Sequence, residues 1–200
     1  RHADEIAVGR RKTLVDTSGY CVDNVLRKNN LDFRQLVCGS EGTLALITGM
    51  TLRTVPIPAE RGCVLLFFDR LEKAAHAATG TLPHSPAACD LMDRRHVNLA
   101  READVRFELL IPGEAEAVLL VEFCGDDRNE IRWRIREVVE QIERRTGLAA
   151  GAYIATEPED ADLCWRLAQS FTPTLSKMKG QTRPVPFVED FAVRPESLAE

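Results

Sequence analysis

The chain has 200 residues, enough for one large domain or two small ones, and its 44% hydrophobic and 28% charged residues are typical of a globular protein. A formal net charge of −5 argues against a nucleic-acid-binding surface, which needs clustered basic residues. The longest apolar runs, 64–68 and 117–121, are far shorter than the ~20 residues of a transmembrane helix, so we predict no membrane span.

The first part of the chain, residues 1–56, has the pattern of a short α/β segment. A turn or helix is expected over residues 16–26, because an Asp-Thr-Ser run at its start can cap it. A buried strand is expected over 44–47 and a half-buried strand over 50–55. The prolines within 56–58 then mark a boundary, since proline removes a backbone donor and restricts φ.

Strands and helices alternate in the rest of the chain. The longest helix carries Ile131, Ile135, Val138 and Ile142 at helical spacing on one face. The order predicts an antiparallel sheet with helices on one face, a ferredoxin-like α+β domain. Strands are expected over 62–68, 87–92, 116–123, 149–155 and 184–193, and helices over 71–79, 93–101, 126–145 and 157–170.

The cysteines and histidines are dispersed along the sequence. No two of the six cysteines form a Cys-x-x-Cys pair, which favours reduced thiols in a cytoplasmic protein over a disulfide framework or a zinc site. The four histidines make no metal-binding pattern either. We therefore predict no metal held within these residues.

A polar turn with the sequence Gly-Ser-Glu-Gly-Thr occupies residues 39–43, just before an apolar run. Its glycines can adopt positive φ or let a ligand approach the backbone, and its hydroxyl and carboxylate groups lie beside exposed N–H groups. From the residues alone, the segment is either a cradle for a polar ligand or a tight turn between strands.

Three segments together carry a resemblance to a known family. Residues 39–56 match G-S-E-G-T-L-G-I-I-T…L-R-x-V-P, residues 16–26 match N-x-x-G-Y-x-L-x-x-L, and residues 183–195 match P-F-V-E-D-x-x-V-P. In these patterns and in this order, the chain resembles the FAD-linked oxidases of the vanillyl-alcohol oxidase type, especially the D-lactate, glycolate and D-2-hydroxyglutarate dehydrogenases. It departs from them at Asp16, Ala45 and Arg194, where the family has Asn, Gly and Pro.

The resemblance implies a domain organisation and an activity. Residues 1–57 would be the C-terminal part of a flavin-binding α+β domain, and residues 58–200 most of a ferredoxin-like cap domain, both within a longer polypeptide. The protein would oxidise a D-2-hydroxy acid by hydride transfer to FAD. The family's pyrophosphate-binding glycine loop lies upstream, so we expect this segment to be inactive by itself.

The resemblance also implies cofactor-binding residues. In the family the Gly-Ser-Glu-Gly-Thr turn lies against FAD, and a following isoleucine adds a backbone contact. Gly19 and Tyr20 are further candidates, with core packing as the alternative for Tyr20. The cofactor candidates are Gly39, Ser40, Glu41, Gly42, Thr43 and Ile47.

Substrate binding is implied for the cap domain. Relatives carry a W-x-x-R pattern whose Arg binds the substrate carboxylate, but here Trp165 is followed by Ala168 at that position. Thr172, Arg183 and Glu189 are the substrate-binding candidates. Lys177 and Lys179 are further cations that could face the substrate. The catalytic base is not assigned.

Two other functions remain open. One is a flavin oxidase acting on an alcohol without a carboxylate, and the other is a catalytically silent module that binds a ligand or a partner chain. The resemblance further allows an iron–sulfur electron-transfer region or subunit as a partner, and places the family's metal-binding histidines beyond Glu200. The segment 91–95 resembles a cap-domain L-M-D-R stretch, in which we interpret Asp93 as a helix cap.

Overall fold

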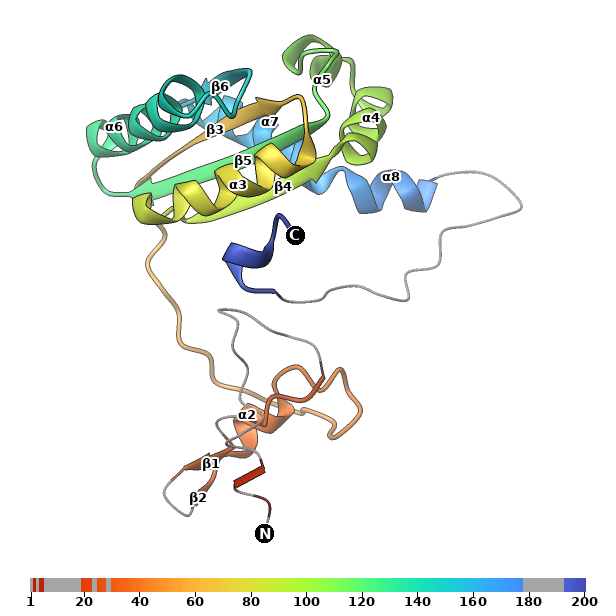
Figure 1. Cartoon of the computed structure of the whole chain (residues 1–200). Coiled ribbons are helices and arrows are strands. Elements are labelled where there is room, and N and C mark those ends of the chain that lie inside the picture. The colour runs from red at the N-terminus through yellow and green to blue at the C-terminus, as the bar shows by residue number, and fades with distance from the viewer. Residues whose placement is uncertain (1, 3, 6–18, 23–24, 28–29, 178–192) are drawn as a thin grey trace. The chain divides into compact units, whose positions relative to one another are not determined.

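The computed structural model describes residues 2, 4–5, 19–22, 25–27, 30–177 and 193–200. Contacts divide the chain into two units (Figure 1). The first unit contains Arg1–Val55 and Pro186–Ser197, and the second contains Pro56–Val185 and Leu198–Glu200. The strand expected over 184–193 falls almost entirely outside the described residues.

The second unit is built on an antiparallel sheet. Its described strands are β3 (Glu60–Phe68), β4 (Ala88–Asp93), β5 (Ala117–Gly125) and β6 (Gly151–Ala155), in the order β4-β5-β3-β6 (Figure 1). The first and third of these strands in the sequence therefore lie in the centre, as in a ferredoxin-like fold. The predicted α+β class and sheet are confirmed.

One face of the sheet is covered by α3 (Leu71–Thr81) and α6 (Arg128–Val139). The two helices pack on every second side chain of β3, beginning with Val64. The side chains between these point to the other face of the sheet. A short 3₁₀ helix, η1 (Leu82–His84), follows α3, and α6 continues as the π-helical η2 (Glu140–Arg145). The predicted apolar face of α6 and η2 is buried in this core.

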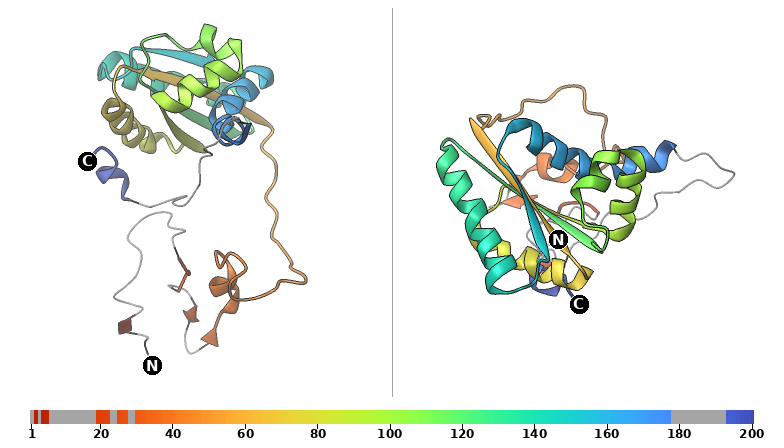
Figure 2. Two further views of the ribbon diagram at one scale, coloured as in Figure 1. Left: turned by 90° about the vertical axis from the view of Figure 1, so that its right-hand side faces the viewer. Right: turned by 90° about the horizontal axis from the view of Figure 1, so that it is seen from above.

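The other face of the sheet is covered by α4 (Arg94–Ala103), α5 (Val105–Leu110) and α7 (Pro158–Gln169), and α8 (Phe171–Lys177) follows α7 (Figure 2). The prediction that helices lie on one face only was therefore wrong. The reason lies in β3 and β5, which are apolar at nearly every position instead of alternating. Such strands must be buried on both faces, which requires two helical layers.

The first unit contains short elements. They are β1 (Leu26–Arg27), β2 (Asn30–Leu31), α2 (Phe33–Val37) and η3 (Pro195–Ser197). Of the turn or helix expected over 16–26, the described residues form no helix; Gly19 lies in a bend and Val25 in a turn that leads into β1. The ladder between β1 and β2 pairs Leu26 with Leu31 and Arg27 with Asn30.

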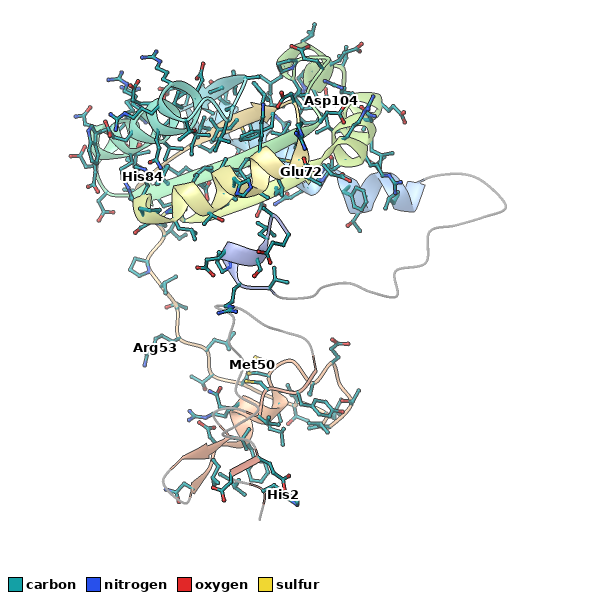
Figure 3. All side chains as sticks on the ribbon, viewed as in Figure 1. His2, Met50, Arg53, Glu72, His84 and Asp104 are labelled. Carbon is teal, nitrogen blue, oxygen red and sulfur yellow. The ribbon has the colours of Figure 1, made fainter. Side chains whose placement is uncertain are left out.

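The strands expected over 44–47 and 50–55 were also wrong. These residues form no strand, and Leu46 and Val55 are 91% and 81% exposed. Met50 and Arg53 lie on this segment (Figure 3). A strand needs a hydrogen-bonded neighbour, and within the described residues of this unit the paired strands are β1 and β2.

The start of α5 provides a test of pH-dependent stability. The Asp104 carboxylate accepts a hydrogen bond from the Arg106 backbone N–H at 3.0 Å and forms an ion pair with its guanidinium (Figure 3). The side-chain hydrogen bond from Arg106, followed by the backbone one, lowers the pKa of Asp104 from 3.8 to about 2. Because the folded-state pKa is depressed, this carboxylate stabilises the fold above pH 3.8, and the contribution is lost as the pH falls toward about 2.

We therefore expect Asp104→Asn to be slightly less stable than the wild type at neutral pH and equally stable near pH 2. Asparagine keeps the helix cap and removes only the charge. Urea titrations at a series of pH values measure the difference. Asp126→Asn, at an exposed residue outside this ion pair, is the control and should not change the pH profile. A stability difference that stays constant with pH would contradict the assignment.

Candidate functional site

The polar turn 39–43 adopts left-handed backbone conformations at three positions. The φ angles are +80° at Gly39, +51° at Glu41 and +72° at Gly42. A Cβ atom built on either glycine would meet nothing within 4 Å, so these glycines are required by their φ angles and not by a close neighbour. Ser40 is 3% exposed, whereas Glu41 and Thr43 lie on the surface.

Hydrogen bonds hold the turn closed and connect it to Tyr20. The Ser40 carbonyl accepts from the Thr43 backbone N–H at 2.9 Å and from the Thr43 hydroxyl at 2.6 Å. The Tyr20 hydroxyl lies 2.8 Å from Thr43 Oγ1. Because the Thr43 proton is directed at Ser40, Tyr20 is the donor in this bond. Two of the motifs recognised in the sequence are thus joined by one threonine side chain.

The turn can serve as one edge of a nucleotide site. Successive backbone N–H groups in a positive-φ turn can surround the polar part of a ligand, and this turn lies on the surface of its unit. The predicted contact residue Ile47 is also exposed. The exposed Glu41 and Thr43 and the positive-φ backbone of the turn are polar groups whose chemistry fits the polar part of FAD.

In the second unit, α7 and the end of the sheet form a cavity of about 730 Å³. The Trp165 indole N–H donates to the Glu122 carboxylate at 2.7 Å, and Arg61 forms an ion pair with Asp162. Sequence analysis missed Glu122, although it is a charged residue within an apolar strand. The cavity is lined by Arg61, Glu122, Glu159, Asp162, Trp165, Arg166 and Gln169.

The substrate-binding candidates are only partly described. Ala168, at the position of the family's Arg, packs against the core, whereas Arg166 lines the cavity. Arg166 is exposed and Ala168 is half-buried, so the two side chains point to different sides of the helix. Thr172 is exposed on α8. Arg183, Glu189 and Lys179 lie outside the described residues, and the side chain of Lys177 is not described either.

Asp93 caps α4, as the sequence predicts. Its carboxylate accepts from the His96 backbone N–H at 2.9 Å. The His96 side chain in turn connects α4 to α7, because its Nε2 lies 2.9 Å from the Leu167 carbonyl. A carbonyl only accepts, so Nε2 carries the proton. The Leu-Met-Asp-Arg stretch thus has a structural role here.

The buried Cys63 thiol of this unit is a poor nucleophile. Cys63 and Cys164 are both fully buried, and the contact between their side chains, followed by burial, raises the pKa of the Cys63 thiol strongly. A thiol that stays protonated is neither a nucleophile nor a metal ligand. Among the described residues, no three side chains of His, Cys, Asp or Glu are grouped to hold a metal ion. None of the described helices is long and apolar enough to cross a membrane.

Comparison with known proteins gives consistent matches. The family described as FAD linked oxidases, C-terminal domain, matches residues 57–200. D-2-hydroxyglutarate dehydrogenase of Pantoea ananatis is 30% identical over 195 residues, which are 92% of this chain and 19% of the relative. D-lactate dehydrogenase of Archaeoglobus fulgidus is 27% identical over 190 residues, 94% of this chain and 37% of the relative.

A third relative is glycolate oxidase subunit GlcD of Bacillus subtilis, 26% identical over 170 residues. The match covers 84% of this chain and 34% of that subunit. The chain thus spans between 19% and 37% of the length of these three relatives.

Proposed function

The chain belongs to the FAD-linked oxidases through their C-terminal domain, and from this premise we propose that it is part of an FAD-dependent oxidoreductase acting on a D-2-hydroxy acid. In this proposal residues 1–57 belong to the FAD-binding domain and residues 58–200 to the cap domain. The names of three relatives carry the argument, because D-2-hydroxyglutarate, D-lactate and glycolate are all 2-hydroxy acids.

The reaction divides the work between cofactor and protein. Bound FAD would supply the redox chemistry, accepting a hydride from the carbinol carbon of the substrate. The turn 39–43, with Ile47, would hold one edge of the cofactor through backbone groups. The Thr43 hydroxyl supports this role, because it donates to the Ser40 carbonyl and accepts from Tyr20, and these two hydrogen bonds fix the turn before a ligand binds.

The cap domain would bind the substrate. A guanidinium makes two parallel charge-assisted hydrogen bonds to a carboxylate. Arg183 would therefore bind the substrate carboxylate in place of the family's Arg, whose position is occupied here by Ala168. Thr172 and Glu189 would then bind the remaining polar groups of the substrate. An iron–sulfur region or subunit would accept electrons from the flavin; in support, the GlcD relative is named as a subunit of an oxidase.

The test uses the full-length protein that contains this segment. We expect it to show the visible absorbance of oxidised flavin and to lose it on anaerobic addition of D-2-hydroxyglutarate or D-lactate, but not of the L-enantiomers. A full-length protein that is colourless and takes up no added FAD would overturn the proposal. The 200-residue segment alone is not suited to this test, because it provides only one edge of the site.

A second function is favoured by one observation. Ala168 packs against the apolar core, so α7 presents no cation at the position where the family binds a carboxylate. A flavin oxidase acting on an aryl or sugar alcohol would need no such cation. Bleaching of the flavin by benzyl alcohol, and by none of the 2-hydroxy acids, would favour this second function.

The threonine of the turn gives a sharper prediction for cofactor binding. Thr43→Val keeps the shape of the side chain but removes both hydrogen bonds of the hydroxyl. At ~1 kcal/mol per bond the two bonds together contribute ~2 kcal/mol, so we expect the dissociation constant for FAD to rise about 30-fold in the full-length protein. Tyr20→Phe removes only one of the bonds and should have a smaller effect. Isothermal titration with FAD measures both, and equal affinities in all three proteins would contradict the role of the turn.

A further inference from the structure

We propose that Glu122 is a positioning residue that fixes the rotation of α7 through its hydrogen bond with Trp165. The orientation of α7 determines where the chain that follows, including Thr172, lies. The inference rests on the proposed function, because it concerns the placement of that substrate-binding residue.

Glu122 is unusual for its surroundings. It lies on the central strand β5, follows a run of fully buried apolar residues, and is itself only 9% exposed. The Trp165 indole N–H, 2.7 Å away, donates to one of its oxygens, and the Cys124 thiol contacts the same carboxylate. A buried carboxylate is costly unless it is hydrogen-bonded, so removing the indole N–H takes away its donor from α7 and leaves the nearby Arg61 charge to stabilise it.

The other described contacts between α7 and the sheet do not determine rotation equally well. Ala161 and Leu167 bury apolar surface, which is non-directional, and Cys164 contacts the Cys63 thiol of β3 through a weak sulfur hydrogen bond. The ion pair of Asp162 with Arg61 is exposed, and exposed pairs contribute little. The hydrogen bond to Glu122 is directional, is made by stronger groups than the thiols and is less exposed than the Asp162 pair, so it constrains the angle of the helix about its own axis.

This angle determines which residues face the cavity and which face the core. Asp162, Arg166 and Gln169 line the cavity with Trp165, whereas Ala168 packs against the core. At the end of α7, His96 holds the Leu167 carbonyl, and Trp165 lies about half a turn earlier. The helix is therefore held at two points just before α8 and Thr172 begin.

The experiment uses the full-length flavoprotein with Glu122→Ala and Trp165→Phe. Each variant breaks the hydrogen bond from one side, and phenylalanine keeps an aromatic ring. We expect KM for the D-2-hydroxy acid to rise about tenfold in each, with unchanged flavin content and a smaller change in kcat. The double variant should show no larger effect than either single variant, because both act through one bond.

Two matched variants separate positioning from general destabilisation. Glu122→Gln keeps an oxygen that accepts from the indole and should restore KM to within about twofold of the wild type. Glu157→Gln removes the exposed ion pairs with Arg128 and Arg132 at the start of the same helix, outside the cavity lining, and should leave KM unchanged. If Glu122→Ala does not fold, the KM values of Trp165→Phe and Glu122→Gln are sufficient to test the inference. A wild-type KM in Trp165→Phe, or effects that multiply in the double variant, would overturn the inference.

Amide hydrogen exchange distinguishes this inference from the proposed function. If the wild-type protein oxidises none of the hydroxy acids, the proposed function fails, and exchange over 158–177 becomes the deciding measurement. Faster exchange there in Trp165→Phe, with the sheet unchanged and Glu122→Gln protected as in the wild type, supports the positioning role. Exchange equal to that of the wild type in Trp165→Phe refutes it.

Discussion

Replacing Phe123 with alanine is expected to lower the free energy of unfolding by about 4 kcal/mol. The ring is fully buried on β5 in the core beneath α3 and α6. The Arg134 guanidinium lies 4.7 Å from the ring centroid, a cation–π geometry worth about 0.5–2 kcal/mol. The substitution therefore leaves a cavity and removes a contact of the arginine that also donates to the carbonyls of His84 and Ser85.

A conservative variant separates these two contributions. Phe123→Leu keeps most of the apolar volume and loses the ring face, so we expect a loss of only about 1–2 kcal/mol. Leu109→Ala, at a side chain that is 85% exposed on α5, is the matched control and should change stability by no more than about 0.5 kcal/mol. Urea titrations followed by circular dichroism measure all three. A loss below about 2 kcal/mol for Phe123→Ala would show that the core refills the space.

The second large effect is expected at Gly62, which lies directly opposite Phe123 in the sheet. A Cβ atom at Gly62 would lie 3.0 Å from methyl groups of both Ile131 and Ile135, and 3.3 Å from the Ala155 carbonyl oxygen. α6 thus approaches β3 so closely that a methyl group at this position fits only if its neighbours shift by a few tenths of an ångström. We expect Gly62→Ala to cost about 2 kcal/mol, because α6 must move away from the sheet.

Gly125 provides the matched control for this prediction. It lies on β5, two residues beyond Phe123, and a Cβ atom there would meet nothing within 4 Å. Gly125→Ala is expected to be neutral within about 0.5 kcal/mol, or slightly stabilising through the unfolded chain. The thermal midpoints of Gly62→Ala and Gly125→Ala, recorded under one condition, test this prediction: that of Gly62→Ala should be lower. Equal midpoints would mean that the isoleucine side chains move aside without cost.

The bounds of strands and helices were predicted correctly where the local sequence pattern agrees with the tertiary packing. The strands around 62–68 and 116–123 and the helices around 93–101 and 157–170 lie within two residues of their predicted ends. The cap at Asp93 was predicted because its carboxylate bonds to a backbone N–H only three residues away. Such features depend on neighbours in the sequence, so the sequence is sufficient to find them.

Secondary structure was predicted wrongly where a segment depends on partners that are distant in the sequence. The pattern 50–55 alternates like a strand, yet these residues pair with no strand of the described chain and remain exposed. The short helix α5 was not predicted, although Asp104 caps it just as Asp93 caps α4. Its six residues are too few to give a clear helical period.

In the candidate site, too, local features were predicted from the sequence and contacts between distant residues were not. The turn 39–43 and its family were recognised from the residues alone, because a motif is local. Its hydrogen bond with Tyr20 joins residues 23 positions apart, and the bond from Trp165 to Glu122 joins residues 43 positions apart. Distance along the chain gives no indication of such contacts, and only the paired strands and packed helices bring them together.

The sequence by itself determined the family, the α+β class and most of the elements of the second unit, because motifs, apolar spacing and caps act over a few residues. Only the tertiary structure decided that helices cover both faces of the sheet, that Gly62 meets α6, and that Glu122 holds Trp165. Each of these depends on close packing between segments remote in sequence, where a single methyl group or one hydrogen bond changes the outcome.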